Sequence, residues 1–266
     1  MASHQLTQEV IWITGATSGL GEALAIQLAK QNNLVIASGR NQHKLLSLAN
    51  QYSNIKPLVF DVTDRSQLQE TRDQLVELSN GFRSEQSSAS GHIDRVILNA
   101  GDCKYFELED SLANDDLDSA NWEAFDQMLD TNFFGAVNSI RIALPLLKKA
   151  DRGHLVVISS MARLAPFPKA EAYGASKAAL SYLVDSLRID LKTTNIDITG
   201  IDPGFIDTPL TQKNQFEMPM LMPVDKAANR IVNTLVKRPF NYTFPKPLKL
   251  AFMMSQWIPK LWLKQF

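Results

Sequence analysis

The stretch VIWITGATSGLGEALAIQLA, residues 10–29, joins a short apolar strand to a helix through a turn that contains three glycines. The strand is continuously apolar and rich in β-branched residues, which is typical of a strand covered on both faces of a parallel sheet. Gly15, Gly19 and Gly21 follow in a G-x-x-x-G-x-G spacing. Glycines at such a turn let the backbone adopt unusual angles and approach a pyrophosphate closely. The helix then directs its N-terminal amide groups and the positive end of its dipole at that anion.

An ordinary tight turn is the alternative interpretation of three glycines. Their position between the first apolar strand and a helix favours the phosphate site instead. The lysine-serine pair that ends the phosphate loop of nucleoside triphosphatases is missing from this turn. A dinucleotide therefore fits the turn better than a nucleoside triphosphate.

The second apolar strand ends in ASGRN, residues 37–41, where a dinucleotide-binding sheet meets the ribose. An enzyme that selects NAD usually has an acidic residue there, whereas this chain has Ser38, Gly39 and Arg40. An arginine pairs with the 2′-phosphate of NADP. Arg40 as a solvated turn residue is the alternative. With no carboxylate nearby in the sequence, we favour NADP(H) over NAD(H).

Short apolar runs and helix-compatible segments alternate along the chain. The expected strands are VIWIT (10–14), LVIAS (34–38), PLVF (57–60), RVILN (95–99), HLVVIS (154–159), IDITGI (196–201) and FNYTF (240–244). The expected helices lie near 19–31, 41–52, 64–80, 121–150, 171–194 and 224–237. This alternation, with right-handed crossovers, predicts an α/β fold with a doubly wound parallel sheet, the Rossmann fold, in a single domain spanning 1–266. We expect a surface loop at 81–92, and a loop or short exposed helix in the acidic stretch 107–120.

Composition excludes several classes of function. The 266 residues carry a net charge of −1 and are 45% apolar, which suits one soluble domain and gives no basic excess for nucleic acid. Cys103 is the only cysteine, so no intrachain disulfide forms and a reducing compartment is expected. The four histidines are far apart, so no metal site is expected. The sequence shows no signal peptide and no run of about 18 apolar residues, so we expect a cytoplasmic protein.

A tyrosine four residues before a lysine is a second candidate for chemistry. The pattern occurs three times, at Tyr52–Lys56, Tyr173–Lys177 and Tyr242–Lys246. Prolines exclude a helix at the first and third of these, and only Tyr173 and Lys177 lie in a good helix former, where positions i and i+4 share a face. An exposed tyrosine resting on a lysine stem is the alternative interpretation.

The neighbouring strand favours a catalytic pair. HLVVIS (154–159) carries Ser159 at its carboxyl end and Ser160 just after it, and ligands of parallel sheets gather at that end. A serine hydroxyl, the Tyr173 phenol and the Lys177 ammonium therefore converge. A free phenol has a pKa near 10, and we expect the ammonium to lower it. This arrangement suits hydride transfer with a proton donor.

The ordered motifs resemble the short-chain dehydrogenase/reductase family, in its branch of about 250 residues per chain, over nearly the whole chain. The motifs are TGATSGLG (14–21), DVTD (61–64), NAG (99–101), the asparagine of DTNFFGAV (130–137), SS with YGASK (159–177) and DPGFIDTP (202–209). The resemblance implies an oxidoreductase that interconverts a carbonyl and an alcohol, assembled as a homodimer or homotetramer. A regulator or scaffold that binds the cofactor without turnover is the alternative.

The resemblance also implies roles for individual residues. Tyr173 is implied as general acid or base, Lys177 as the group that lowers its pKa and holds the ribose, and Ser160, thirteen residues before the tyrosine, as the partner of the substrate oxygen. Asn132 is implied as the anchor of a proton-relay water. The implied cofactor residues are Gly15, Thr17, Ser18, Gly19, Leu20, Gly21, Arg40, Asp61, Val62, Asn99, Ala100, Gly101, Tyr173, Lys177, Pro203, Gly204, Ile206 and Thr208. Ser18 stands where many NADP-dependent members have a basic residue, which leaves more of the 2′-phosphate to Arg40.

The C-terminal segment PKPLKLAFMMSQWIPKLWLKQF (245–266) mixes large apolar residues with lysines. Packing on its own domain, on the substrate cleft or on a second subunit is the favoured interpretation, and contact with a membrane surface is the alternative. We hypothesise that residues 205–222 and 247–266 form an apolar lid over the substrate. Phe167, Phe205, Met218, Met220, Leu221 and Met222 indicate a hydrophobic substrate.

Overall fold

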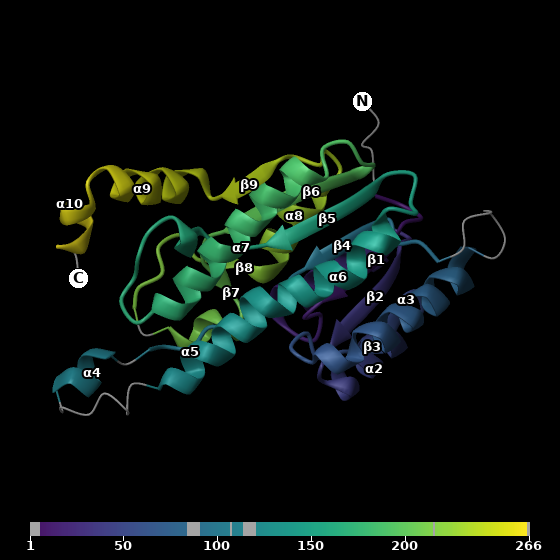
Figure 1. The fold of residues 1–266 in the computed structure, drawn as a ribbon, viewed down its shortest axis with the longest axis horizontal. Helices are drawn as coiled ribbons and strands as arrows, with labels where there is room; N and C mark the ends of the chain where they lie inside the picture. The colour runs from purple at the N-terminus through teal and green to yellow at the C-terminus, as the bar shows by residue number, and fades with distance from the viewer. Residues whose placement is uncertain (1–5, 84–90, 107, 114–120, 215, 265–266) are drawn as a thin grey trace.

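The computed structural model describes residues 6–83, 91–106, 108–113, 121–214 and 216–264. Within them, seven parallel strands form a central sheet in the order β3-β2-β1-β4-β5-β6-β9 (Figure 1). The strands are β1 (Val10–Thr14), β2 (Leu34–Gly39), β3 (Ile55–Val59), β4 (Arg95–Leu98), β5 (Gly153–Ile158), β6 (Ile196–Pro203) and β9 (Asn241–Phe244), and β7 (Ile206–Asp207) pairs with β8 (Met222–Pro223) outside the sheet. The predicted doubly wound parallel sheet is confirmed.

Helices cover both faces of the sheet, because its strands are apolar on both sides. In β1, Ile11 and Ile13 belong to one buried cluster, and Val10 and Trp12 to the other. The first cluster includes side chains of α1 (Gly19–Ala29), α2 (Gln42–Gln51) and α8 (Val224–Leu235). The second includes side chains of α3 (Leu68–Arg83), α6 (Gly135–Leu147) and α7 (Glu171–Asp190). Strand periodicity of two residues thus divides the core into two layers.

Most predicted elements are present with boundaries shifted by a few residues. β3 starts at Ile55 rather than residue 57, and α3, preceded by a 3₁₀ turn (Arg65–Gln67), continues to Arg83 instead of ending at 80. The rest of the predicted loop at 84–90 lies outside the described residues. In the acidic stretch, α4 (Leu108–Ala113) matches the short-helix alternative, and residues 107 and 114–120 lie outside the description.

The long helix predicted at 121–150 is interrupted. It consists of α5 (Trp122–Leu129), a π-helical turn η3 (Asp130–Phe134) and α6. A π turn contains one residue more than an α turn and is frequent at functional sites. Asn132, one of the predicted site residues, lies inside this turn and is fully buried.

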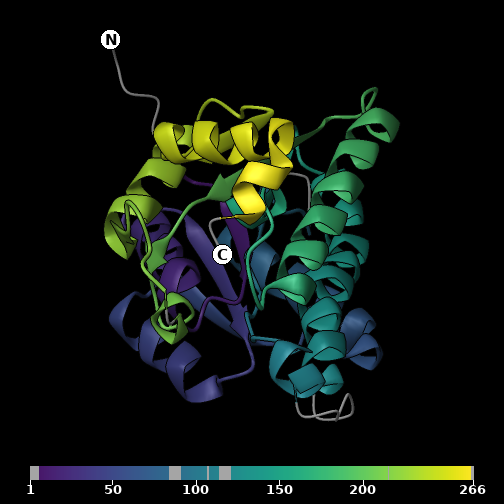
Figure 2. The same ribbon diagram turned by 90° about the vertical axis from the view of Figure 1, so that its left-hand side faces the viewer.

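The C-terminal segment forms two helices that the sequence analysis did not assign. α9 (Lys246–Trp257) and α10 (Pro259–Leu263) follow β9, and Figure 2 shows α9 running across the top of the molecule with α10 turned down from it. Their inner side packs near two 3₁₀ turns, η4 (Met161–Arg163) and η5 (Thr211–Lys213), that flank the site. Within the described part of the chain, every helix is too short or too polar to cross a bilayer.

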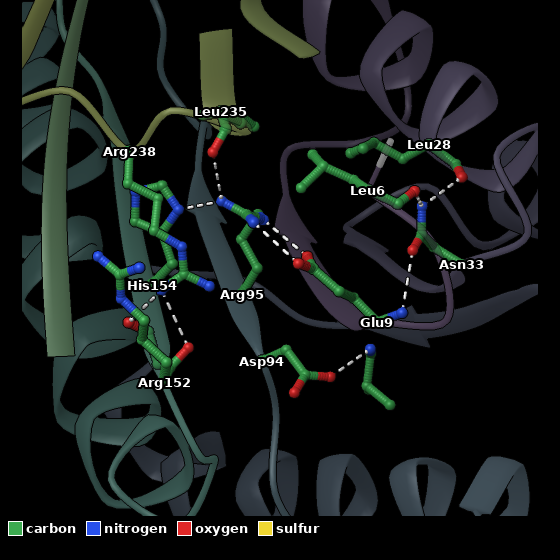
Figure 3. Close-up of polar contacts among 12 residues, drawn as sticks. Leu6, Glu9, Leu28, Asn33, Asp94, Arg95, Arg152, His154, Leu235 and Arg238 are labelled. Atoms are coloured by element: carbon green, nitrogen blue, oxygen red, sulfur yellow. Dashed lines mark hydrogen bonds and ion pairs between the residues drawn. The ribbon is translucent and has the colours of Figure 1, made fainter. Parts of the chain in front are cut away.

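The amino ends of β4 and β5 hold a buried cation, shown in Figure 3. Arg95 is fully buried; its Nε and Nη2 donate to the Glu9 carboxylate at 2.9 and 3.0 Å, and its Nη1 contacts His154 Nδ1 and Leu235 O. His154 Nε2 lies 2.8 Å from Thr199 Oγ1, whose hydroxyl donates to Pro239 O. His154 therefore donates from Nε2 and accepts at Nδ1, which is the neutral form. Burial and the surrounding arginines lower its pKa well below 6.5.

Candidate active site

A cleft of about 450 Å³ lies at the carboxyl ends of the strands. Its lining combines the turn after β1, the ends of β2 and β3, the loops after β4, β5 and β6, and helix α7. Ligands bind at this edge of doubly wound sheets, near the point where the strand order reverses. Here the reversal lies between β1 and β4.

The glycine turn leaves no room for side chains. Gly15 has φ +68°, and a Cβ there would lie 2.7 Å from the Cα of Ala100. A Cβ on Gly21 would lie 2.2 Å from Gly15 O. Ser18, the N-cap of α1, makes no side-chain cap bond, so its hydroxyl does not occupy the amide groups of the first turn. This cradle of backbone and amide groups fits a pyrophosphate.

The end of β2 presents one cation to the cleft. Arg40 lines the cleft, is exposed, and has no ion-pair partner within the described residues. Ser38 instead has a structural role, because its buried hydroxyl accepts from Trp12 Nε1 at 2.9 Å. Asp61 also lines the cleft, and its Oδ1 accepts from the backbone and side chain of Thr63. Arg40 could therefore meet an anionic group of a ligand at this end of the cleft.

Helix α7 carries the tyrosine and lysine one turn apart, as predicted. Tyr173 is half-buried, and Lys177, only 5% exposed, donates from Nζ to Ile158 O at 3.2 Å. The ammonium lies 5.9 Å from the centre of the Tyr173 ring. Ser160 follows β5 and its side chain hydrogen bonds with Tyr173. Ser159 points elsewhere, to Ser181 Oγ and the carbonyl of Lys177.

The pKa of Tyr173 is not lowered as the sequence analysis expected. Burial raises the pKa of Tyr173 to about 12, although the hydrogen bond with Ser160 acts in the opposite direction. The expected lowering by Lys177 is absent, because the ammonium interacts with a carbonyl of β5 instead. Burial also lowers the pKa of Lys177 to about 8. The phenol is thus held in its protonated form, and the lysine titrates close to neutrality.

Asn132 lies behind the cleft rather than in its wall. Its Nδ2 donates to Asp102 O at 2.9 Å and to Ser176 Oγ at 3.1 Å, and its Oδ1 accepts from the Asp102 amide at 2.8 Å. Ser176 Oγ in turn donates to Tyr173 O. The π turn therefore places an asparagine that ties the loop after β4 to the helix of the tyrosine and lysine.

A second, apolar cavity of about 90 Å³ adjoins the cleft. Ser160 and Tyr173 line both, and aromatic side chains of Phe167, Phe205 and Phe252 line the apolar one. A polar pair faces it as well, since Tyr105 OH donates to Asn214 Oδ1 at 2.7 Å.

The methionines expected near the substrate lie elsewhere. Met222 forms β8 and is buried in the core, while Met220 and Leu221 are 53% and 43% exposed. Met218 and these three line neither cavity, although Met218 Sδ accepts from Asn214 Nδ2, a residue of the apolar cavity, at 3.2 Å.

The structure brings the predicted cofactor residues together. All of them line the cleft except Gly21, which packs under the turn. The sequence analysis did not single out Asp102 or Lys213, which line the cleft and lie 3.5 Å apart, although Lys213 falls in the hypothesised lid segment 205–222. Phe252, in the hypothesised lid segment 247–266, lines the apolar cavity. Asp102 directly follows the NAG motif, whereas Lys213 and Phe252 reach the site through long-range packing. Among the described residues, no cluster of three or more acidic, histidine or cysteine side chains could hold a metal ion.

Comparisons with known proteins agree with this geometry. An uncharacterized oxidoreductase of Myxococcus xanthus is 31% identical over 259 residues, covering 96% of this chain and 94% of the relative. A serine dehydrogenase of Escherichia coli superposes with a TM-score of 0.69 at 26% identity, covering 88% of this chain and 95% of that one. An alcohol dehydrogenase of Thermococcus sibiricus, solved with 5-hydroxy-NADP, superposes with a TM-score of 0.73 at 22% identity over 89% of this chain and 96% of that one. The family model described as short chain dehydrogenase matches residues 9–218. By this match and by its similarity to the relatives, the chain belongs to the short chain dehydrogenase family.

Proposed function

We propose that the protein is an NADP(H)-dependent oxidoreductase that interconverts a carbonyl and an alcohol on a hydrophobic substrate. One observation carries the proposal: Ser160 and Tyr173 lie on the boundary between a cleft that fits a dinucleotide and an apolar cavity. A substrate oxygen at that boundary would meet a phenol and a serine hydroxyl, while its hydrocarbon part would meet Phe167, Phe205 and Phe252.

The residues present fit NADP(H). The glycine turn would hold the pyrophosphate, Arg40 the 2′-phosphate, and the side chains near Pro203, Ile206 and Lys177 the nicotinamide end. The chemistry that bound NADP(H) supplies is the transfer of a hydride to or from the substrate carbon. The chain itself supplies the proton and the orientation.

In the reductive direction, Tyr173 donates its hydroxyl proton to the substrate oxygen as the carbon gains a hydride. The pKa of about 12 keeps this phenol protonated at neutral pH, so its proton is present when the carbonyl binds. Ser160 donates a hydrogen bond to the same oxygen. Lys177, with a pKa of about 8, holds and releases a proton near neutrality at Nζ, beside the Ile158 carbonyl. Asn132 is a positioning residue for α7 through Ser176.

Residues 205–222 and 247–266 are proposed as lid elements of the substrate cavity. Phe205 and Phe252 line the cavity, and Phe216 stacks on Phe167 with ring centres 6.4 Å apart. This arrangement supports the inclusion of both segments in the wall that excludes water from the reacting atoms.

Calorimetry with NADPH and NADH side by side tests the cofactor. We expect NADPH to bind more tightly, and Arg40→Ala to weaken NADPH binding by about 10- to 100-fold because one charge-assisted phosphate contact is lost. NADH binding should not change. Lys44→Ala, an exposed cation on α2, is the matched control. Equal affinity for both nucleotides would contradict the NADP(H) preference.

A panel of aldehydes and ketones with NADPH tests the activity. Tyr173→Phe removes only the hydroxyl, so we expect kcat to fall by about 10²- to 10⁴-fold with NADPH affinity retained. Tyr182→Phe, on the exposed side of the same helix, is the control. Binding of NADPH without turnover of any compound would favour a cofactor-binding regulator over an enzyme.

A further inference from the structure

The C-terminal helices are fixed to the molecule by one side only. Leu248, Phe252 and Ser255 are the buried positions of α9, and their spacing places them on one face. Trp262 of α10 packs on Phe167 and Phe252 and donates from Nε1 to Pro166 O at 2.8 Å. This inner face forms part of the wall of the apolar cavity.

The opposite side of the same helices is also apolar, and it is exposed. Leu250, Met254 and Trp257 recur at helical spacing, on the face roughly opposite Leu248, and are 62%, 53% and 85% exposed. In α10, Leu261 and Leu263, on either side of the inward-packed Trp262, are also exposed, at 56% and 62%. We call these five side chains, with Met253 and Ile258, the outer face. A cluster of exposed apolar side chains of this kind marks an interaction site.

The charge around the outer face has one sign. Between residues 245 and 266 the sequence contains four lysines, Lys246, Lys249, Lys260 and Lys264, and no acidic residue. Within the described residues none of the four has an ion-pair partner. The segment is therefore locally positive, although the whole chain has a net charge of −1. A binding partner that matches the outer face would therefore have an apolar surface bordered by negative charge.

A second copy of the chain does not meet that requirement. A two-fold interface sets the same patch against itself, so the lysines of one copy would approach those of the other. Tryptophan beside lysine on an apolar helix instead suits the boundary between lipid headgroups and acyl chains, where an anionic leaflet attracts the lysines.

We propose that the outer face of α9 and α10 binds the surface of an anionic lipid bilayer. The helices then lie in the interfacial plane, and the apolar cavity lined by Phe252 is separated from the bilayer by about one helix diameter of 10 Å. Resting on the proposed function, this placement assigns the substrate to carbonyls and alcohols that partition into membranes.

Co-sedimentation of the full chain with vesicles tests the docking. We would use phosphatidylcholine alone and phosphatidylcholine with 30% phosphatidylglycerol at low ionic strength, where about 30% anionic lipid gives a strong surface field. The double substitution Leu250→Gln with Trp257→Ser should weaken binding at least about 10-fold, because both side chains lose their apolar insertion. Tyr182→Ser, at a 77% exposed aromatic position on α7, should leave binding unchanged.

Substitution of the lysines provides a second test of the docking. Lys249→Gln with Lys260→Gln should weaken binding to the anionic vesicles by about 25-fold, because each lysine contributes a factor of roughly five. The matched control, Lys149→Gln with Lys192→Gln, removes two exposed lysines from other helix ends and should have no effect. An unchanged midpoint of thermal unfolding would show that the variants are folded.

Two results would overturn the proposal. One is failure of the parent chain to sediment with anionic vesicles. The other is a concentration-dependent dimer, seen by light scattering, that the Leu250→Gln with Trp257→Ser variant abolishes, since a second copy would then cover the outer face. NADPH binding measured on the same samples keeps this test apart from the proposed function: vesicle binding without NADPH binding supports the docking and refutes the enzyme.

Discussion

Two buried cations occupy opposite ends of neighbouring strands, and their surroundings differ. Arg95 begins β4 and is fully buried, with the Glu9 carboxylate, His154 Nδ1 and Leu235 O around its guanidinium. Lys177 lies at the carboxyl end of β5 and is 5% exposed, yet its one protein acceptor in hydrogen-bond contact within the described residues is Ile158 O. No carboxylate pairs with it there.

The fold pairs the Arg95 guanidinium with a carboxylate and leaves the Lys177 ammonium without one. The guanidinium of Arg95 has the Glu9 carboxylate and two neutral acceptors around it, which offset part of the burial that still lowers its pKa. The ammonium of Lys177 is desolvated without an anion, and its pKa falls to about 8 as a result. A buried charge without a counter-charge lowers the stability of the fold. Such charges are found mainly where a reaction requires them.

The largest expected effect is on stability at the amino ends of the strands. Arg95→Met should lower the free energy of unfolding by about 3 kcal/mol, because it leaves Glu9 and His154 without their donor. Urea denaturation followed by circular dichroism would measure this. The double variant Glu9→Gln with Arg95→Met removes both charges and should recover part of the loss. A stability equal to the parent's in Arg95→Met would contradict the compensation.

The next effect has the opposite sign. Lys177→Met should raise the free energy of unfolding at pH 7 by about 1–2 kcal/mol while abolishing turnover, because it removes an uncompensated charge. The folded-state pKa of about 8 lies below the unfolded value near 10.4, so the unfolded chain binds more protons between these values. The parent should therefore gain stability as pH rises from 8 towards 10.4, relative to the variant. A destabilised Lys177→Met would remove the contrast between the two cations.

The smallest effect concerns the neutral histidine beside Arg95. The pKa of His154 is lowered in the folded state, so below pH 6.5 only the unfolded chain gains the proton. Stability should decline by about 1 kcal/mol between pH 6.5 and 5.5. His154→Gln preserves an acceptor and a donor but does not titrate, so its curve should be flatter. His43→Gln, at an exposed position on α2, should keep the slope of the parent.

The carboxyl end of the sheet was predictable from sequence in more detail than the amino end. Glycine spacing, the end of β2 and the tyrosine–lysine pair are local patterns with direct physical meaning, and they led to residues that the structure brings into one cleft. Arg95 and His154 carried no such pattern. They meet because β4 and β5 pair in a register that sets one opposite the other, across 59 positions of sequence.

Two features of the site were also beyond local reasoning. Apolar periodicity runs through residues 121–150 without a break, so the π turn at 130–134 could not be anticipated. The inner face of α9 was hidden for a related reason. That helix is apolar on two opposite sides, and sequence alone does not distinguish the side that packs on Phe167 from the side that remains exposed.

The π turn has a consequence for how this chain tolerates insertions and deletions. Because η3 holds one residue more than a regular turn, the side chains of α5 are rotated about the helix axis by roughly 100° from the positions that they would have if α5 and α6 formed one uninterrupted α-helix. That rotation directs Trp122 and Phe125 of α5 onto Phe106, while α6 keeps Ile140 and Leu146 on the sheet. Removing a single residue from 130–134 would bring the two helices into one phase and turn either the aromatic cluster or the core face outward. A one-residue deletion here would therefore do more harm than many substitutions.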